Sequence, residues 1–254
     1  MKRGWSGVFV AAIVAVTACG DLSVDPDEVT AIVFDELPSP SIVAGDTLRD
    51  STGAVAPLTA RLFDAEGDEV TGPLEFFPQE PSLRVISGHR LVAERTATGS
   101  VGVLASTIGI QSIVRQVEIV EAAPDSLSAS DIIAPLQWVV PDDPQQNTSQ
   151  PLIVRVLSGP DSGVRLWVVK FRLEVGGRII PENDTTQIFL VGETGRPSYT
   201  DTTDAAGRAS RRVRLRVVPG LVPPDSAVIT AFASYRGSPL IGSPARMVLP
   251  LRLR

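Results

Sequence analysis

A nine-residue stretch, W-V-V-K-F-R-L-E-V at positions 167–175, decides the fold. Its odd-numbered positions are all apolar, whereas three of its even-numbered positions are charged, namely Lys170, Arg172 and Glu174. An alternation of period two is typical of a β-strand with one face in a core and the other in water. The stretch therefore predicts a half-buried strand in a layered β-protein.

The same alternation returns along the chain. In residues 211–218 three arginines alternate with apolar residues: Arg212, Arg214 and Arg216. Shorter apolar runs, separated by Gly, Pro and Asp, predict further strands at 29–34, 58–63, 74–77, 83–86, 90–94, 101–107, 113–120, 132–140, 152–157, 187–191, 227–235 and 246–251. No window offers a clear apolar stripe of period 3.6, so helix is expected to be nearly absent. Strands of this density predict an all-β chain of two sandwiches.

Composition narrows the class of protein. The 254 residues suit one large domain or two ordinary ones, and 43% hydrophobic with 20% charged residues excludes a disordered chain. A single His, His89, and a single Cys, Cys19, exclude disulfides, Cys/His zinc sites and paired-His chemistry. The net charge of −6 argues against a nucleic-acid partner, which requires a basic face.

The N-terminus predicts export. Lys2 and Arg3 precede an apolar run at 8–16, which is followed by small residues and Cys19. This run is too short to span a bilayer as a helix, which takes about 20 residues, so we expect a cleaved signal peptide.

The stretch V-T-A-C at 16–19 resembles the lipobox of bacterial lipoproteins. The resemblance implies cleavage after residue 18 and acyl chains such as palmitate on Cys19, with the membrane as the partner of the anchor. Because Gly20 rather than Asp follows the cysteine, it also implies the outer membrane as destination in a two-membrane bacterium. The alternative is an ordinary secretory signal with an incidental cysteine.

The mature chain is expected to have three parts. Residues 1–18 would be removed, 19–28 would form an acidic tether, and 29–122 and 125–254 would form two sandwiches, with the boundary near Pro124. The polar segment P-D-D-P-Q-Q-N-T-S-Q at 141–150 is expected to be an exposed, mobile loop.

Several motifs resemble immunoglobulin-like domains of bacterial adhesins. Residues 29–120 resemble the intimin type in A-G-D-T (44–47), L-T-A-R-L-F-D-A-E-G-D-E-V (58–70), S-G-H-R-L-V-A (87–93) and T-A-T-G-S-V-G-V-L-A-S (96–106). They depart from it in L-E-F-F-P-Q-E-P (74–81), where that family has a tryptophan strand. Residues 125–254 resemble the invasin type more loosely, in P-L-I-V-R-V-L (151–157) and T-D-A-A-G-R-A-S (203–210). The resemblance implies immunoglobulin-like sandwiches that serve as stalks or adhesive tips.

Acidic clusters are the first candidates for chemistry. Four carboxylates have the spacing of an EF-hand loop: Asp64, Glu66, Asp68 and Glu75. Glu69 stands where that loop needs Gly, so a solvated hairpin turn is the preferred interpretation. Asp201 and Asp204 could form a weak cation site, but are more simply explained as capping the turn before Gly207.

Other candidates have simpler explanations in turns and sheets. Asp161-Ser162-Gly163 matches the aspartic-protease tripeptide but follows a Gly-Pro turn, and His89 follows Ser87-Gly88 at a hairpin. The glycine pairs at 176–177 and 192/195 open no helix, so no phosphate site is expected. Arg212, Arg214 and Arg216 could attract an anionic polymer, but cross-strand pairing with carboxylates is preferred in an acidic chain.

The sequence therefore predicts no catalytic residue, no metal site and no cofactor. We expect a non-catalytic, lipid-anchored protein of the cell envelope that acts as a stalk, adhesion or scaffold module, with a protein or glycan ligand that the sequence does not identify. The alternative is a carbohydrate- or peptidoglycan-binding accessory lipoprotein, which exposed aromatic side chains at Trp138 or Tyr199 would favour.

Overall fold

The computed structural model describes residues 28–254 except 97, 131, 219 and 221–223. Within these residues the secondary structure consists of strands, and none of them forms a helix that is long and apolar enough to cross a membrane. The expected signal peptide, Cys19 and most of the expected tether lie outside the described residues.

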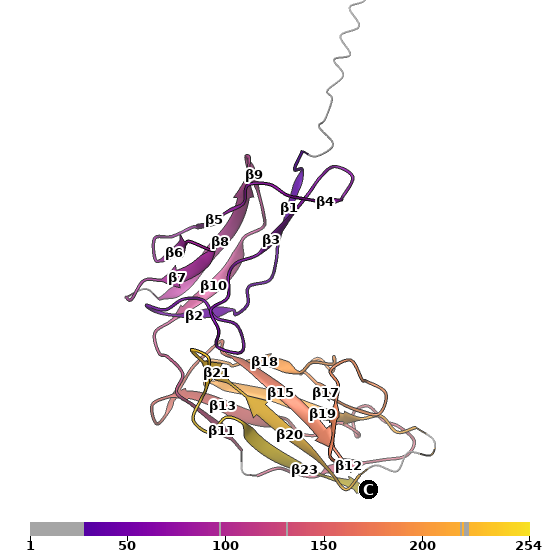
Figure 1. The fold of residues 1–254 in the computed structure, drawn as a ribbon. Helices are drawn as coiled ribbons and strands as arrows, with labels where there is room; N and C mark the ends of the chain where they lie inside the picture. The colour runs from indigo at the N-terminus through magenta and orange to yellow at the C-terminus, as the bar shows by residue number, and fades with distance from the viewer. Residues whose placement is uncertain (1–27, 97, 131, 219, 221–223) are drawn as a thin grey trace, which may run out of the picture.

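The first sandwich has two layers (Figure 1). Its strands are β1 (Ala31–Phe34), β2 (Ser41–Val43), β3 (Ala60–Phe63), β4 (Glu69–Val70), β5 (Glu75–Pro78), β6 (Leu83–Ile86), β7 (Arg90–Ala93), β8 (Gly99–Thr107), β9 (Ile110–Gln111) and β10 (Arg115–Val120). One sheet has the order β2-β10-β8-β5, with β2 parallel to β10; the opposite side holds β1-β3-β4 and the β6–β7 hairpin. Phe34, Leu91 and Val103 are among the side chains that fill the core between them.

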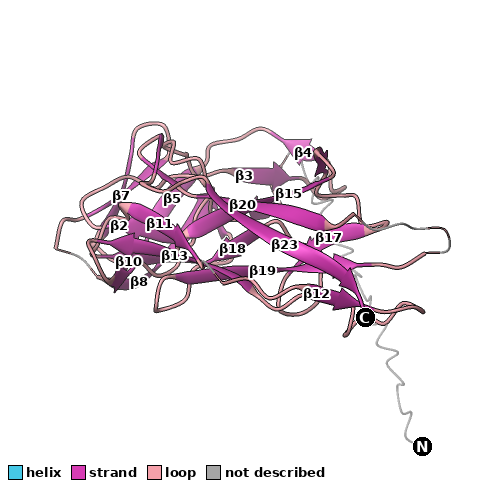
Figure 2. Ribbon diagram, turned by 90° about the horizontal axis from the view of Figure 1, so that it is seen from below, coloured by secondary structure: helices cyan, strands magenta, loops and turns pink. Residues whose placement is uncertain are grey.

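The second sandwich has longer strands. They are β11 (Ser126–Ala129), β12 (Leu136–Trp138), β13 (Leu152–Ser158), β14 (Ser162–Gly163), β15 (Val168–Val175), β16 (Arg178–Ile180), β17 (Ile188–Val191), β18 (Thr200–Thr202), β19 (Arg208–Leu215), β20 (Ser226–Phe232), β21 (Ser234–Tyr235), β22 (Ser238–Pro239) and β23 (Ala245–Leu253). Its sheets have the orders β11-β13-β19-β17 and β12-β23-β20-β15-β16. Figure 2 shows β20 and β23 of the second of these sheets side by side.

Strand order identifies the class of sandwich. When the main strands of the second sandwich are lettered in chain order, one sheet is A-B-E-D and the other contains C-F-G, which is the immunoglobulin arrangement. In both sandwiches a short early strand also pairs in parallel with the last one, as β2 does with β10 and β12 with β23. The prediction of an all-β chain with immunoglobulin-like sandwiches is confirmed.

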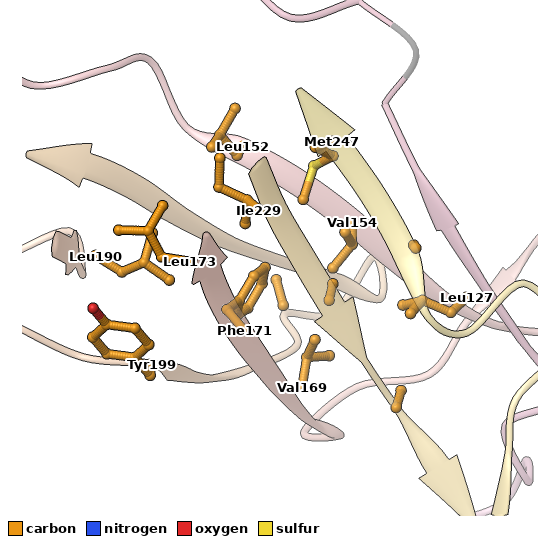
Figure 3. Close-up of a cluster of buried hydrophobic side chains, with 14 of the residues drawn as sticks. Leu127, Leu152, Val154, Val169, Phe171, Leu173, Leu190, Tyr199, Ile229 and Met247 are labelled. Carbon is orange, nitrogen blue, oxygen red and sulfur yellow. The ribbon is translucent and has the colours of Figure 1, made fainter. Parts of the chain in front are cut away.

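The core of the second sandwich confirms the period-two pattern. Val169, Phe171 and Leu173 of β15 are at most 3% exposed, whereas Lys170 and Arg172 between them are exposed. Figure 3 shows Phe171 and Leu173 pointing into a cluster with apolar side chains of neighbouring strands. Every strand pairing among the described residues stays within β1–β10 or within β11–β23.

Two strand predictions were imprecise. The run at 132–140 forms only the three-residue strand β12, whose partner is β23 of the same sandwich. The segment at 121–126 was expected to be a linker, but β11 begins at Ser126 and pairs with β13. The alternation of β11, S-L-S-A, is too short and too weakly apolar to stand out in the sequence, because pairing with β13 rather than local pattern stabilises it.

The segment at 141–150, expected to be an exposed loop, is exposed at half of its residues but is anchored by two buried side chains. Asn147 is fully buried and Ser149 is 4% exposed. The amide of Asn147 bonds both backbone groups of Val139, and the hydroxyl of Ser149 accepts the N–H of Val213 at 2.9 Å. Polar side chains can be buried where such partners are present, so this segment is a packed strap across β19. We call residues 139–150 the strap.

Candidate functional site

The clearest site lies where the two sandwiches meet. Asp46 follows β2 in a tight turn, in which its N–H donates to the carbonyl oxygen of Val43 at 2.9 Å. Gly45 adopts φ +76°, a conformation that costs glycine little and other residues more. The turn directs the Asp46 carboxylate towards Tyr235 and Arg236, in the segment between β20 and β23 of the second sandwich.

Four donors satisfy this carboxylate. Within the first sandwich it accepts the N–H of Thr47 at 2.7 Å and two bonds from the Arg49 guanidinium, both at 3.0 Å. From the second sandwich it accepts the Tyr235 hydroxyl at 2.7 Å and the Arg236 guanidinium at 3.2 Å. We call Asp46, Arg49, Tyr235 and Arg236 the clamp. Its centre is buried, since the Asp46 side chain is 8% exposed.

The pKa values of two clamp residues, Asp46 and Tyr235, are strongly shifted. Burial alone raises the pKa of Asp46, but hydrogen bonds from Arg49, Tyr235 and Thr47 outweigh it and hold the pKa well below the ordinary carboxyl value. Burial and the bond to Asp46 raise the pKa of Tyr235 to about 12. Asp46 is therefore ionised and Tyr235 protonated at neutral pH, which is the pairing that the geometry requires.

Aromatic packing supports the clamp. The Tyr235 ring meets Trp167 edge-on, with centroids 5.7 Å apart and the planes at 79°. The Arg49 guanidinium also lies over the Tyr235 ring, 5.7 Å from its centre. The space left between these residues is about 10 Å³, room for about one water molecule.

Backbones approach closely beside the clamp. A Cβ on Gly53 would lie 2.8 Å from the backbone nitrogen of Gly237, so a larger residue would push the two loops apart. The Ser41 hydroxyl donates to the carbonyl oxygen of Leu166 at 2.8 Å. Arg165 pairs with Glu118 across the same junction. The two sandwiches therefore touch along several elements.

Apolar contacts complete the junction. Val43 and Val120, at the ends of β2 and β10, belong by contact to the buried cluster of the second sandwich, where they accompany Trp167. The junction thus combines apolar burial with one saturated carboxylate. Such a carboxylate has no free lone pair for a proton transfer and no space for a substrate, so the chemistry of the clamp is that of a fixed connection.

The acidic turn is a hairpin between β3 and β4. The Asp64 carboxylate accepts the N–H groups of Glu66 and Asp68 at 3.0 and 2.8 Å, which closes the turn on itself. Glu75 begins the next strand, β5. The interpretation as a hairpin turn agrees with this geometry. No group of three or more His, Cys, Asp or Glu gathers at metal-binding distance within the part of the chain that the structure describes.

The other predicted turns are also present. Asp204 accepts the N–H groups of Ala206 and Arg208 at 2.8 and 2.9 Å, as a capping residue does, while Asp201 accepts Ser210 N–H at 2.7 Å and pairs with Arg211. Asp161 precedes β14, which turns back onto β13.

The remaining turn candidates lie at hairpins. His89 has φ +54° between β6 and β7, and its ring contacts Phe76. Gly176 and Gly177, both with positive φ, form the turn between β15 and β16.

The three arginines of 212–216 differ from one another. Arg214 is 8% exposed and pairs with Asp142 at 2.5 Å, but Asp142 lies in the strap and not in a neighbouring strand, so the expected cross-strand pairing is not the arrangement found. Arg212 and Arg216 have no carboxylate within ion-pair distance among the described residues; the Arg216 guanidinium lies over the Phe189 ring, 5.6 Å from its centre. These arginines line an open hollow of about 740 Å³, which Glu193 also lines.

The aromatic residues that could have supported carbohydrate stacking are covered. Tyr199 is 4% exposed and belongs to the core of the second sandwich (Figure 3). Trp138 is partly buried and packs against the same core. Tyr199 therefore offers no open ring face of the kind the alternative function needed.

Sequence reasoning missed the clamp altogether. Asp46 stood in the A-G-D-T motif of 44–47 with no role assigned to it, and Tyr235 at the end of the apolar run 227–235. The one available signal was Tyr235-Arg236-Gly237, an aromatic and a cation at the tip of a hairpin, where exposed side chains of these types mark contact surfaces.

No protein-family model matches the chain, and no curated protein matches it in sequence. Among solved structures it resembles the Yersinia pseudotuberculosis adhesin InvE, at 14% identity and a TM-score of 0.35, over 87% of this chain and 58% of InvE. Domains 4 and 5 of the S-layer protein SbsC match at 12% identity and a TM-score of 0.32, over 89% of this chain and 98% of the SbsC chain. The Escherichia coli adhesin FdeC matches at 12% identity and a TM-score of 0.31, over 87% of this chain and 63% of FdeC. Likeness this distant supports no conclusion about function, which is argued below from the geometry of this chain.

Proposed function

We propose that this protein is a non-catalytic, lipid-anchored component of the cell envelope, in which two immunoglobulin-like sandwiches form a stalk, adhesion or scaffold module. The observation that carries the proposal is the clamp. Its buried carboxylate joins two donors of one sandwich to two side chains of the other. A module that presents a surface at a distance from a membrane needs such a fixed joint, since a free linker would let the outer sandwich fold back.

The anchor belongs to the same proposal. Acylation of Cys19 would hold the chain at the membrane, because two or more acyl chains bind firmly where one does not. The ten residues 19–28 reach about 35 Å when extended, which leaves the first sandwich clear of the lipid surface. The second sandwich is then the outer one, and the outer membrane is the proposed location.

A catalytic role has less support from the described residues. Catalysis needs an acid, a base or a nucleophile with open space beside it. Asp46, the most perturbed carboxylate, is surrounded by donors instead. Carbohydrate binding by aromatic stacking, the form in which the alternative was expected, loses support because Tyr199 is buried and Trp138 partly so.

The test is fractionation of cells that express the full chain. Wild-type protein is expected in the membrane fraction and should incorporate labelled palmitate, whereas Cys19→Ala should be exported, unlabelled and soluble. Asp21→Ala, which keeps the cysteine, is the matched control and should remain with the membrane. An unlabelled, soluble wild-type protein would overturn the anchor and with it the proposed function.

A further inference from the structure

The open face of the second sandwich is strongly basic. Its strands β15, β20 and β23 lie side by side in Figure 1 and pair in register. Four cations stand on the outer side of this sheet, Lys170, Arg172, Arg246 and Arg252, and all are exposed. Glu174 is the one carboxylate on the outer side of the same three strands. None of the four cations lies within ion-pair distance of a carboxylate in the described part of the chain. We call these four residues the basic face.

Register fixes the spacing of the basic face. Arg172 is opposite Thr230, and Thr230 is opposite Arg246, so the two arginines stand two strands, about 10 Å, apart. Lys170 precedes Arg172 on the same side of β15 by two residues, about 7 Å. Unpaired like charges at these distances repel one another. An anionic partner would relieve this repulsion.

Part of the basic face is held in place before any ligand binds. The Arg172 guanidinium lies over the Phe232 ring, 5.1 Å from its centre. Thr230 is only 6% exposed although it lies on the outer side, which places it beneath its neighbours. Cation–π contact limits the freedom of Arg172, so less entropy is lost when it pairs with an anion.

Charge is divided unequally along the chain. Residues 124–254 contain 15 Arg or Lys against 12 Asp or Glu, whereas residues 20–123 contain 6 against 17. The overall acidity therefore comes from the tether and the first sandwich. An acidic polymer would be repelled by these and attracted to the second sandwich alone.

We propose that the basic face binds an acidic polysaccharide, whose carboxylate or sulfate groups pair with Arg172, Arg246 and Lys170. The cations stand on β15 and β23, on either side of β20, and this separation suits an extended polymer better than one small anion. Thr200 of β18, exposed and directly opposite Lys170, adds a hydroxyl for sugar groups.

A nucleic acid fits this surface less well. Bases bind open sheet faces by stacking on aromatic rings, and the one aromatic residue on the outer side of these strands, Phe232, lies beneath Arg172. The choice of a polysaccharide also rests on the proposed envelope location. The binding itself does not require the lipid anchor, so the two proposals can fail separately.

The experiment measures binding of the full-length protein in nonionic detergent to alginate, heparin, neutral dextran and single-stranded DNA. Alginate carries carboxylate groups and no sulfate, whereas heparin also carries sulfate. Comparing the two affinities therefore shows which of the two groups the protein recognises. We expect binding to one or both acidic polysaccharides, no binding to dextran, and a loss of about tenfold in affinity between 50 and 200 mM salt. Absence of binding to both acidic polysaccharides, equal binding of dextran, or tighter binding of DNA would overturn the proposal.

Variants locate the site. The double variant R172E/R246E should lose at least about tenfold in affinity for the polysaccharide. The control R212E/R216E makes the same change of charge on the other sheet of the same sandwich and should retain binding. The variant R172Q/R246Q removes the two charges without reversing them. It should also lose affinity for the polysaccharide, and it replaces the glutamate variant if that variant does not fold. Equal losses in the control and the test variants would show a general charge effect and refute the assigned face.

Discussion

The hydroxyl of Tyr235 donates to the carboxylate of Asp46 at 2.7 Å, although 189 positions separate the two residues in the chain. The same carboxylate oxygen also accepts the Arg49 and Arg236 guanidinium groups. One atom of the first sandwich is thus the meeting point of donors from both. This arrangement makes the coupling between the sandwiches measurable.

The first prediction concerns that coupling. In a double-mutant cycle of Asp46→Ala and Tyr235→Phe, we expect a coupling free energy of about 1.5 kcal/mol, because hydrogen bonds to a charged group are worth more than neutral ones. Denaturant unfolding of the full chain gives the unfolding free energies of the wild type, the two single variants and the double variant. The pair Asp64→Ala and Tyr235→Phe is the control and should be additive, since Asp64 lies in the β3–β4 turn. Additivity in the first cycle would mean that the bond does not hold the junction.

The second prediction is a pH dependence with opposite signs at its two ends. The pKa of Tyr235 is raised to about 12, so its contribution to stability is complete below the ordinary tyrosine value of about 10 and is lost as pH rises towards 12. The pKa of Asp46 is lowered, so its contribution is complete above about pH 4 and is lost as pH falls. The chain has two tyrosines, so tyrosinate absorbance isolates Tyr235 when Tyr235→Phe is subtracted. A titration of Tyr235 near pH 10 would contradict the contact.

The third prediction concerns the strap. Hydrogen bonds from Arg214 lower the pKa of Asp142 to about 2. Asp142→Asn should weaken this pair, lower the stability by about 2 kcal/mol and expose the strap to proteolysis. In the wild type the same contribution is lost as pH falls from about 4 towards 2. Asp143→Asn is the control, because its carboxylate bonds only within its own turn, to Gln145 and Gln146. Equal proteolysis of the two variants would refute the role of Asp142.

The fourth prediction concerns a glycine in the second sandwich. A Cβ on Gly207 would lie 2.4 Å from the carbonyl oxygen of Val156, and the residue has φ +73°. Gly207→Ala should therefore cost more than about 2 kcal/mol, from left-handed strain plus the collision. Gly195, with φ +76°, has nothing within 4 Å of its Cβ position, so Gly195→Ala should show the strain alone, about 1 kcal/mol. Thermal unfolding of both variants distinguishes the two contributions.

The fifth prediction is that each sandwich folds alone. Fragments 26–123 and 124–254 each contain a separate buried cluster and all the strand pairings of their own half. We expect each to melt cooperatively with a β-type circular dichroism spectrum. The first fragment should lose about 1 kcal/mol for each of Val43 and Val120, which pack against the second core. An unfolded fragment beside a folded full chain would show that the boundary near Pro124 is misplaced.

The sequence predicted those features that depend on neighbouring residues alone, namely which face of a strand is buried and where a turn forms. The alternation of 167–175 placed Val169, Phe171 and Leu173 in the core because a strand offers only two faces. It also placed Lys170 and Arg172 on the wet side. The turn at Asp64 followed equally from its own side chain, which bonds N–H groups two and four residues ahead.

Contacts between distant residues could not be predicted in this way. Arg214 and Asp142 are 72 positions apart, and nothing local distinguishes Asp142 from the other acidic residues of the chain. The segment at 141–150 was expected to be exposed because it is polar, and half of its residues are exposed, yet Asn147 is buried with its partners. A polar side chain is expected to be exposed only when no hydrogen-bond partner is available inside the protein. For Asn147 the fold supplies that partner, and the local sequence does not reveal it.

The parallel pairing of β2 with β10 determines how the first sandwich responds to tension. Their register joins Ser41 to Glu118 and Val43 to Val120. The chain passes from β1 into β2 and leaves the first sandwich through β10. A pull between the tether and the second sandwich that is transmitted past β1 therefore drags β2 and β10 in opposite directions along their length. Parallel strands loaded in this way slide past one another, and their hydrogen bonds share the force instead of opening one at a time. A stalk built on this joint resists extension by shear.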